Sequence, residues 1–261
     1  MRITVILCTY NRCNILGKAL GSVAGSILPN GVGWEVLVID NNSSDLTRDV
    51  VNDYCESYSN RFRYVFEPRP GKSHALNTGI RESCGDILAF MDDDVTVEPM
   101  WLQNLTQPLF GNEWVGSGGR IPPDWPSKPP HWLALDGPRS LAGILALFDL
   151  GPHPCQLDRA PFGTNMAFKK SVFEKYGGFR TDLGPRPGSE IRDEDIEFCN
   201  RLFAAGEKLR YEPAAVVYHA IPENRLKKEY FTAFWFDHGR ARVRAMGPRP
   251  NLLGIPRHYL S

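Results

Sequence analysis

The sequence lacks a net charge, because its 30 Lys and Arg residues are matched by 30 Asp and Glu residues. This balance creates no long-range field that would attract a nucleic acid, and we expect no such partner. Apolar runs are short, and none approaches the ~20 residues that a membrane-spanning helix needs. The first strand-like run follows Met1 and Arg2 directly, so we expect no signal peptide.

Paired cysteines are also absent: no CxxC pair and no zinc-like spacing connects the six, which are Cys8, Cys13, Cys55, Cys84, Cys155 and Cys199. Thiols at such irregular spacing are typical of reduced cysteines in a cytosolic protein, and we expect a cytoplasmic location. The phosphate loops Gly-x-Gly-x-x-Gly and Gly-x-x-x-x-Gly-Lys-Ser are missing as well. Their absence argues against a dinucleotide-binding or Walker-type site.

The first 110 residues alternate between apolar runs and helical spacing. The predicted strands are 3–8, 34–39, 62–66 and 87–91, and the predicted helices between them are 14–23, a segment running to Tyr58, and 73–84. We expect Ser44 or Asp45 to cap the second of these helices. Strands that alternate with helices predict an α/β fold with a mostly parallel sheet, right-handed crossovers and flanking helices. At 261 residues, the chain forms one large domain or two intimately packed ones.

Three aspartates, Asp92, Asp93 and Asp94, end the apolar run 87–91 abruptly. Aspartate is a poor strand former, and adjacent carboxylates repel one another unless a positive charge lies among them. A divalent cation held by Asp92 and Asp94, with Asp93 turned away, is the simplest explanation. All-oxygen ligation favours Mg²⁺ or Mn²⁺, and Mg²⁺ is commonly held by one or two carboxylates and substrate phosphates. The alternative is an aspartate-rich helix N-terminus that the helix dipole stabilises.

Polar side chains also follow the other predicted strands, and ligands of open α/β sheets bind at the carboxyl ends of strands. Thr9 offers a hydroxyl there, and Asp40 can accept a hydrogen bond from a base N–H or a ribose hydroxyl. Lys72 lies at a predicted helix start and suits a diphosphate. Each has a plainer alternative, with Asp40 and Asp45 as turn or cap residues and Lys72 as a solvated charge.

Residues 111–160 are rich in Gly, Pro and Trp, and we expect no regular structure there. Such a loop can line a groove, and the flat faces of Trp125 and Trp132 suit sugar rings, although exposed tryptophans more often pack. We therefore place recognition of a second substrate in this segment. Residues 162–168 are predicted as a short strand opened by Gly163, which lets the backbone approach a ligand closely.

Two later segments carry candidate chemistry. The acidic cluster at 193–197, in which only Ile196 is not acidic, opens a predicted amphipathic helix. Asp195 can act there as a general base toward a hydroxyl if it faces the active end of the sheet. The alternative is that acids in the first turn complement the helix dipole. His219 follows the strand-like run 210–218, where it is either a structural hydrogen-bonding group or a metal ligand.

The tail, 221–261, interleaves aromatic and basic side chains over 224–244. This pattern predicts a helix that can lie on an anionic membrane surface, in peripheral contact with the inner face of the cell membrane. Packing back on the domain, or a homodimer contact, is the alternative. Membrane contact would suit a lipid-linked substrate.

Together, these motifs resemble family 2 glycosyltransferases of the GT-A fold over about residues 3–220. They occur in the family's order, as Thr9-Tyr10-Asn11-Arg12, Asp40, Gly71-Lys72-Ser73 with Asn77 and Gly79, Asp92-x-Asp94, Gly163-Thr164-Asn165-Met166, Glu194-Asp195 and His219. The resemblance implies a metal-dependent, inverting transfer from a nucleotide-diphosphate sugar, with a UDP-sugar as the favoured donor. The implied acceptor is a saccharide or a lipid-linked hydroxyl, in polysaccharide or cell-envelope glycan synthesis.

The resemblance also implies roles for individual residues. Asp94 and Asp92 would bind Mg²⁺ or Mn²⁺, with His219 completing the metal site. Asp195 would be the catalytic base and Glu194 would bind the acceptor, although Asp193 offers a second aspartate as base. The donor-binding set would be Thr9, Tyr10, Arg12, Asp40, Lys72, Asn77, Asp92, Asp93, Gly163 and Asn165.

The chain then divides into a nucleotide-sugar-binding half (1–110), an acceptor-binding and catalytic half (111–220) and a helical tail (221–261). Two other classes stay open. A sugar-phosphate nucleotidylyltransferase would carry a glycine-rich signature with Arg and Lys, and none follows Leu7. A non-catalytic nucleotide-sugar-binding protein would be indicated by the loss of Asp94 or Asp195, and both are present.

Overall fold

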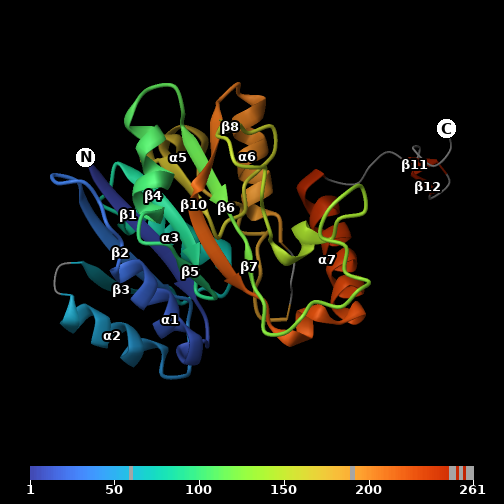
Figure 1. Ribbon diagram of the computed structural model, residues 1–261, viewed down its shortest axis with the longest axis horizontal. Helices are drawn as coiled ribbons and strands as arrows, with labels where there is room; N and C mark the ends of the chain where they lie inside the picture. Colours follow the sequence, from blue (N-terminus) through green and yellow to red (C-terminus); the bar gives the residue numbers. More distant parts are fainter. Residues whose placement is uncertain (59–60, 189–191, 247–250, 253–254, 257–261) are drawn as a thin grey trace.

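The computed structural model describes residues 1–58, 61–188, 192–246, 251–252 and 255–256 (Figure 1). Its strands are β1 (Arg2–Thr9), β2 (Gly33–Asp40), β3 (Phe62–Phe66), β4 (Ile87–Asp92), β5 (Val95–Val97), β6 (Gly116–Arg120), β7 (Pro123–Asp124), β8 (Cys155–Gln156), β9 (Met166–Lys169), β10 (Leu209–Ala220), β11 (Asn251–Leu252) and β12 (Ile255–Pro256). Its helices are α1 (Cys13–Ala24), α2 (Thr47–Ser57), α3 (Lys72–Glu82), α4 (Trp101–Thr106), α5 (Lys170–Tyr176), α6 (Glu194–Ala204) and α7 (Lys228–Met246), with 3₁₀ turns η1 (Gln107–Phe110), η2 (Ala142–Leu145) and η3 (Glu223–Leu226).

Ten of the described strands form one sheet, with the main order β3-β2-β1-β4-β9-β6-β10-β5 and with β7 and β8 paired to β10. The four strands of the first half are parallel, as their alternation with helices predicts. Strand β9 then runs antiparallel between β4 and β6, so the second half of the sheet is mixed. The register pairs Cys8 with Asp92 and Thr9 with Asp40, which brings the ends of β1, β2 and β4 to one edge.

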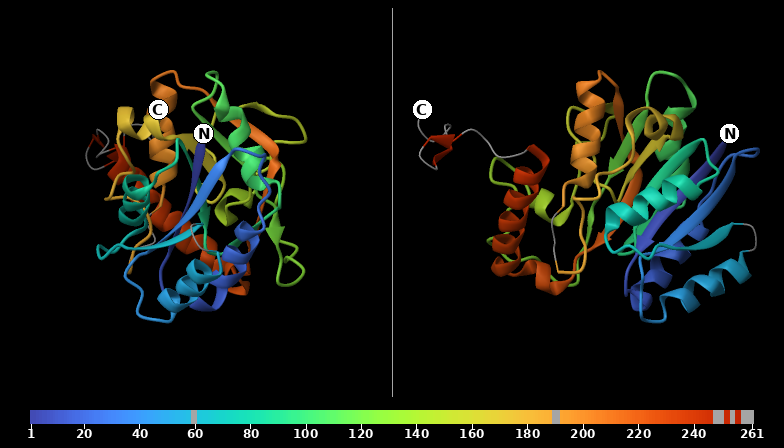
Figure 2. Two further views of the ribbon diagram at one scale, coloured as in Figure 1. Left: turned by 90° about the vertical axis from the view of Figure 1, so that its left-hand side faces the viewer. Right: turned by 180° about the vertical axis from the view of Figure 1, so that it is seen from behind.

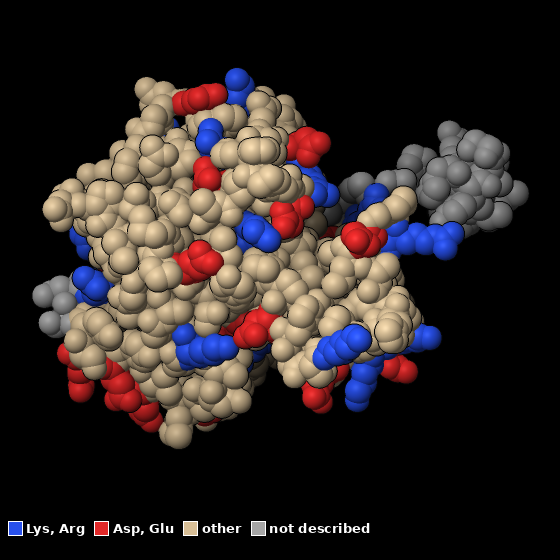
Figure 3. Space-filling view, in the orientation of Figure 1, with Lys and Arg blue, Asp and Glu red and all other residues tan. Residues whose placement is uncertain are grey.

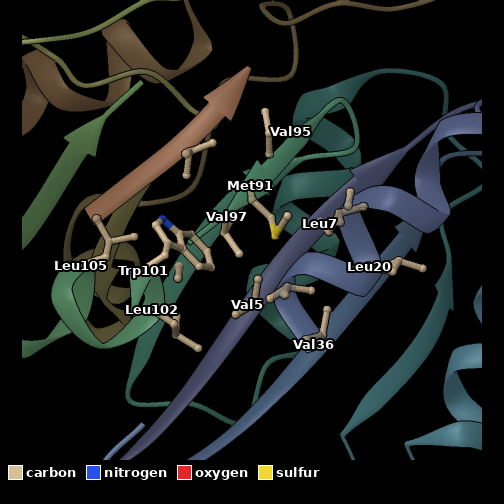
Figure 4. Packing of buried hydrophobic residues seen from close by; sticks show 14 of the residues in the cluster. Val5, Leu7, Leu20, Val36, Met91, Val95, Val97, Trp101, Leu102 and Leu105 are labelled. Carbon is tan, nitrogen blue, oxygen red and sulfur yellow. The ribbon is translucent and has the colours of Figure 1, made fainter. Parts of the chain in front are cut away.

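The central strands are buried on both faces of the sheet. In β1, Val5 and Leu7 point to the face covered by α1, α2 and α4, whereas Ile6 points to the face covered by α3, α5 and α6 (Figures 1 and 2). Figure 4 shows the first face, where Met91 and Trp101 fill the space beside β1. Because both faces are covered, these strands consist of continuous apolar runs rather than alternating ones.

Strand β6 corrects the expectation that 111–160 has no regular structure. Although glycine-rich, β6 lies inside the sheet between β9 and β10. A Cβ at Gly116 would lie 2.5 Å from Cδ1 of Phe168, and one at Gly118 would lie 2.3 Å from Cβ of Pro161. These glycines therefore leave room for bulky side chains that pack directly against the strand backbone.

Two local expectations also change. The predicted strand 162–168 begins only at Met166, because the N–H of Asn165 closes a turn onto the carbonyl of Phe162 at 3.0 Å. Asp45 precedes the N-cap position of α2 by one residue, but it still fixes the start of that helix. Its Oδ1 accepts a hydrogen bond from the N–H of Thr47 at 3.0 Å.

Helix α7 packs on the segment that precedes η2 and on η2 itself. Phe231 is buried in a cluster with Leu133, Ile144, Leu145 and Ile221. The ring of Trp132 meets Phe231 edge to face at 5.2 Å, and Trp125 packs against the same cluster. Both tryptophans therefore pack against this cluster, although Trp132 stays 36% exposed, and their predicted contact with a substrate stays a prediction.

The outer side of α7 is exposed, with Trp235, Phe236 and Val243 at 56%, 69% and 61% exposure. Among the described helices, none is both long and apolar enough to cross a membrane. On the described part of the face drawn in Figure 3, basic and acidic side chains are interspersed. This distribution follows the balanced composition of the chain.

Candidate active site

Two adjoining cavities open at the edge of the sheet where β1 and β4 end. The acidic-turn cavity, about 290 Å³, is lined by Asp92, Asp93 and Asp94 together with Thr9, Tyr10, Arg12, Lys72 and Arg225. The α6 cavity has a volume of about 330 Å³. It is lined by Glu194 and Asp195 of α6, by Trp235 and His238 of α7, and by Gly163 and Thr164, which precede β9. Lys72 and Asp92 line both cavities, so the structure brings the two acidic clusters to one place.

The three aspartates of the acidic turn have cationic partners within the chain. Oδ1 of Asp92 lies 2.5 Å from Nζ of Lys72, and Nη1 of Arg12 lies 2.7 Å from Asp93 and 2.9 Å from Asp94. Burial raises the pKa of Asp93 to about 6, although Arg12 opposes the shift. The repulsion that suggested a metal ion is therefore relieved by Lys72 and Arg12, and Asp92 and Asp94 face different partners.

Asp94 and His219 are the pair best suited to a divalent cation. Nδ1 of His219 lies 2.9 Å from the carbonyl oxygen of Leu145, which can only accept, so this nitrogen carries the proton. Nε2 of His219 is then unprotonated, and it lies 3.7 Å from Oδ1 of Asp94. Metal-binding histidines commonly donate their other N–H to a backbone carbonyl in this way. A cation here would take one carboxylate, one imidazole and further oxygens from a substrate phosphate.

The charge of Asp94 also suits this role. Burial acts to raise the pKa of Asp94, but His219, Arg12 and Arg225 together hold it well below its usual range. Asp94 is therefore ionised throughout the neutral range. Among the described residues, no group of three or more His, Cys, Asp or Glu side chains is arranged to hold a metal by itself. The metal roles of Asp92, Asp94 and His219 stay predictions.

Glu194 and Asp195 begin α6 and face the α6 cavity. Oδ2 of Asp195 accepts a hydrogen bond from the N–H of Gly163 at 2.8 Å, and a Cβ on that glycine would lie only 3.4 Å from the same oxygen. Burial raises the pKa of both carboxyl groups, and the charge of Asp195 helps to raise that of Glu194 to about 7. Carboxylates with raised pKa values inside a cavity are suited to accept a proton near neutral pH.

Asp193, the alternative base, has a histidine partner in the tail. Its Oδ2 lies 3.1 Å from Nδ1 of His238, which connects the start of α6 to α7. The backbone of Asp193 is in the left-handed region, with φ of 77°. Asp193 is thus engaged by a side chain, whereas Asp195 accepts from the backbone N–H groups of Gly163 and Ile196, and the choice of base between them stays a prediction.

Asp40 lies at the predicted edge of the sheet but lines neither cavity and is only 2% exposed. Its oxygens accept hydrogen bonds from the hydroxyl of Tyr64 at 2.7 Å and from the N–H of Ser43 at 2.9 Å. The next residue, Asn41, lines the acidic-turn cavity instead, and its Oδ1 accepts a hydrogen bond from the N–H of Gly71 at 2.7 Å. Sequence reasoning passed over Asn41, although its place after a buried strand was a usable signal.

Asn77 and Asn165 also lie outside both cavities. Asn77 clamps the backbone of Phe179, donating to its carbonyl at 2.7 Å and accepting from its N–H at 2.8 Å. Asn165 is fully buried, accepts from the indole N–H of Trp101 at 2.8 Å and donates to two backbone carbonyls. Their side chains thus bond within the protein, and their predicted contact with a donor stays a prediction.

Thr164 entered the sequence prediction only as part of a motif, yet the residue lines the α6 cavity. The residue is 3% exposed, and among the described residues its Oγ1 has no hydrogen-bond partner. A buried hydroxyl without a partner costs about 1–3 kcal/mol, which a bound ligand would recover. Trp235, His238 and Arg225 were likewise missed as cavity residues, because their basic and aromatic pattern was interpreted as a surface helix.

Solved structures of glycosyltransferases share this fold. A mannosyltransferase from Pyrobaculum calidifontis, solved with GDP-Man and Mn²⁺, has a TM-score of 0.65 at 23% identity, over 95% of this chain and 65% of its own. GalNAc-T7, solved with UDP, GalNAc and Mn²⁺, has a TM-score of 0.66 at 16% identity, over 84% of this chain and 43% of its own. At these identities the likeness establishes the fold alone, and the chain spans less than two thirds of either protein.

Curated relatives match nearly the whole chain. The glucosyl-dolichyl phosphate glucuronosyltransferase of Haloferax volcanii is 26% identical over 258 residues, which are 95% of this chain and 79% of that protein. The succinoglycan biosynthesis protein ExoM of Rhizobium meliloti is 25% identical over 250 residues, which are 95% of this chain and 76% of that protein. The profile of glycosyl transferase family 2 matches residues 4–177, which is more than half of the chain. The protein therefore belongs to glycosyl transferase family 2 and is a glycosyltransferase with the GT-A fold, as its motifs predicted.

Proposed function

We propose that the enzyme transfers a sugar, with inversion, from a nucleotide-diphosphate sugar to a hydroxyl of a saccharide or lipid-linked acceptor, in cell-envelope glycan or polysaccharide synthesis. A divalent cation, Mg²⁺ or Mn²⁺, would assist, and a UDP-sugar is the donor that we expect. The observation that carries this proposal is the pair of adjoining cavities. One is lined by Asp94, whose Oδ1 lies 3.7 Å from the buried His219, and by basic side chains, and the other is lined by Glu194 and Asp195.

The acidic-turn cavity would bind the donor. Arg12 and Lys72 offer positive charge to the diphosphate, and Thr9 and the exposed ring of Tyr10 lie where the nucleoside would sit. Asp94 and His219 would hold the cation, which neutralises charge on the diphosphate as it leaves. The two solved structures that share the fold contain Mn²⁺ with GDP-Man in one and with UDP and GalNAc in the other, which supports a cation and a nucleotide as ligands.

The α6 cavity would bind the acceptor. Asp195 would remove the proton from the acceptor hydroxyl, whose oxygen then forms a bond to the anomeric carbon on the face opposite the diphosphate. The bond from that carbon to the phosphate oxygen breaks, and the nucleoside diphosphate leaves with the electron pair. Glu194 would orient the acceptor through a hydrogen bond.

A lipid-linked acceptor is supported by the position of α7. Phe234, Trp235 and His238 line the α6 cavity, while Phe236 and Val243 of the same helix are exposed beside basic residues. Such a helix can rest on an anionic bilayer with its aromatic side chains in the interface. The Haloferax volcanii relative, whose name includes a dolichyl phosphate, is consistent with this acceptor class.

A donor screen tests the proposal. Purified enzyme with Mn²⁺ or Mg²⁺ would be incubated with UDP-, GDP- and dTDP-sugars, and release of nucleoside diphosphate would be followed. We expect one nucleotide sugar to be hydrolysed or transferred, and a chelator to stop the reaction. Release of pyrophosphate from a sugar phosphate and a nucleoside triphosphate would instead identify a nucleotidylyltransferase, and donor binding without turnover would identify a non-catalytic binding protein.

A further inference from the structure

Arg225 occupies an unusual position for an arginine of a surface turn. It lies in η3, between the end of β10 and the start of α7, and its side chain is only 15% exposed. Its Nη1 donates to Nε2 of His219 at 3.2 Å, and its Nη2 lies 3.7 Å from Oδ2 of Asp94. One guanidinium group thus bridges the two side chains that are best suited to hold a divalent cation.

The bridge and a bound cation exclude each other. Nε2 of His219 has one lone pair, which can accept from Arg225 or bind a metal but cannot do both. Arg225 cannot give up its charge, because a guanidinium stays protonated in proteins. A divalent cation on Asp94 would therefore lie against a fixed positive charge unless the guanidinium moved away.

Resting on the proposed function, we propose that Arg225 is a competitor of the divalent cation that becomes a donor-binding residue. Without a donor, it holds Asp94 and His219 together in the cation's place. When the cation and the nucleotide diphosphate bind, the guanidinium leaves this pair and forms paired hydrogen bonds with the diphosphate. Arginine suits this exchange because its planar fork binds a carboxylate and a phosphate equally well.

The surroundings give the released guanidinium both a destination and a consequence. Arg225 already lines the acidic-turn cavity together with Arg12 and Lys72, so a diphosphate in that cavity lies within its reach. It also packs over the ring of Tyr230 in α7, 5.8 Å from the ring centroid. Helix α7 also supplies Trp235 and other residues to the α6 cavity. A shift of Arg225 against Tyr230 would therefore connect donor binding to the cavity proposed for the acceptor.

Two binding measurements with opposite expected signs test the proposal. Both measurements compare the wild type with Arg225→Gln. In the first, Mn²⁺ alone is titrated and its binding is followed by electron paramagnetic resonance. In the second, UDP is titrated in the presence of saturating Mn²⁺ and its binding is followed by calorimetry. The variant should bind Mn²⁺ alone about tenfold more tightly, because a neighbouring positive charge is removed. It should bind UDP with Mn²⁺ about tenfold more weakly, because a charge-assisted contact to the diphosphate is lost.

Matched variants make the result decisive. Arg225→Lys keeps the charge but loses the fork, so its Mn²⁺ affinity should stay near that of the wild type. Arg240→Gln removes an exposed arginine of α7 that pairs with Asp237, and both affinities should be unchanged. Thermal unfolding would show that each variant is folded.

The outcomes separate the two proposals. If Arg225→Gln binds Mn²⁺ alone as the wild type does, or more weakly, the exchange is wrong even where the wild type binds Mn²⁺ and UDP together. If the wild type binds no Mn²⁺ even with UDP present, the metal assignment in the proposed function fails instead.

Discussion

Asp94 lines the acidic-turn cavity and Asp195 lines the α6 cavity, and Lys72 and Asp92 line both. The cationic groups around Asp94 hold its pKa low, whereas burial raises that of Asp195. The same side-chain type is thus prepared for two different tasks by its surroundings. A charged Asp94 suits a cation, and Asp195 suits a proton.

Substitution of each aspartate should separate these tasks. Asp94→Asn should lower turnover by about a hundredfold or more and abolish its dependence on Mn²⁺, because the anionic ligand is lost. Asp195→Asn should lower kcat by about a hundredfold or more but leave donor affinity unchanged, because only the proton acceptor is lost. Steady-state kinetics and calorimetric titration of the donor measure both effects. An equal loss of donor affinity in the two variants would contradict this division.

The acidic pair of α6 should set the pH dependence of the reaction. The pKa of Glu194 is raised to about 7, so the fully charged pair, which accepts the proton, forms as the pH rises through that value. We expect kcat/KM to increase over the same range. In Glu194→Gln the increase should move to lower pH, because Asp195 then loses the anionic neighbour Glu194. A pH–rate profile of the variant that still rises near 7 would indicate a different titrating group.

At the scale of single elements, β6 shows how packing can override local propensity. A run of glycines weakens a strand, yet the close approach of Phe168 and Pro161 requires them. Gly116→Ala should lower the free energy of unfolding by about 1–3 kcal/mol, because the new Cβ overlaps the ring of Phe168. Gly111, whose added Cβ would meet nothing within 4 Å, provides the control.

Urea denaturation of Gly116→Ala and Gly111→Ala measures this difference. The control should stay within about 0.5 kcal/mol of the wild type. Similar stability in both variants would mean that Phe168 can move aside without cost.

Helix α7 carries the second prediction at this scale. Phe236→Ser should weaken binding to vesicles that contain anionic lipid by about tenfold, because a buried phenyl ring contributes roughly 1.5–3 kcal/mol. Phe110→Ser, at an exposed aromatic of η1, should leave binding unchanged. Vesicle flotation measures both variants. If Phe236→Ser instead dissociates a dimer in sedimentation and leaves vesicle binding intact, the exposed face of α7 is a contact between two copies of the chain.

At the scale of the whole molecule, the candidate site is assembled from residues that lie far apart along the chain. β1, α3 and β4 provide one wall, and α6 and α7 provide the other. The parallel half of the sheet and the acidic turn were predictable, because they depend on local patterns of apolar and acidic residues. The register of β1 with β2 and β4 confirms that the polar strand ends lie at one edge.

Other features depended on contacts that no local pattern encodes. Asn165 belongs to the motif that supported the family resemblance, yet its amide is fully used by buried partners. Likewise, the aromatic-basic pattern of the tail indicated a surface helix, but its inner side closes the α6 cavity. Which face of α7 is buried was decided by its packing against Leu133, Ile144 and neighbouring residues.

By itself, the sequence determined the parallel strands and helices of the first half, the acidic residues that end β4 and begin α6, and the family, because each follows from residue types at short spacing. Only the tertiary structure decided which cation meets which carboxylate. Arg12 is paired with Asp94 and Lys72 with Asp92 across long stretches of chain, and Arg225 bridges Asp94 and His219. The physical reason is that charge pairing depends on distance in space, and the sheet, not the order of residues, sets that distance.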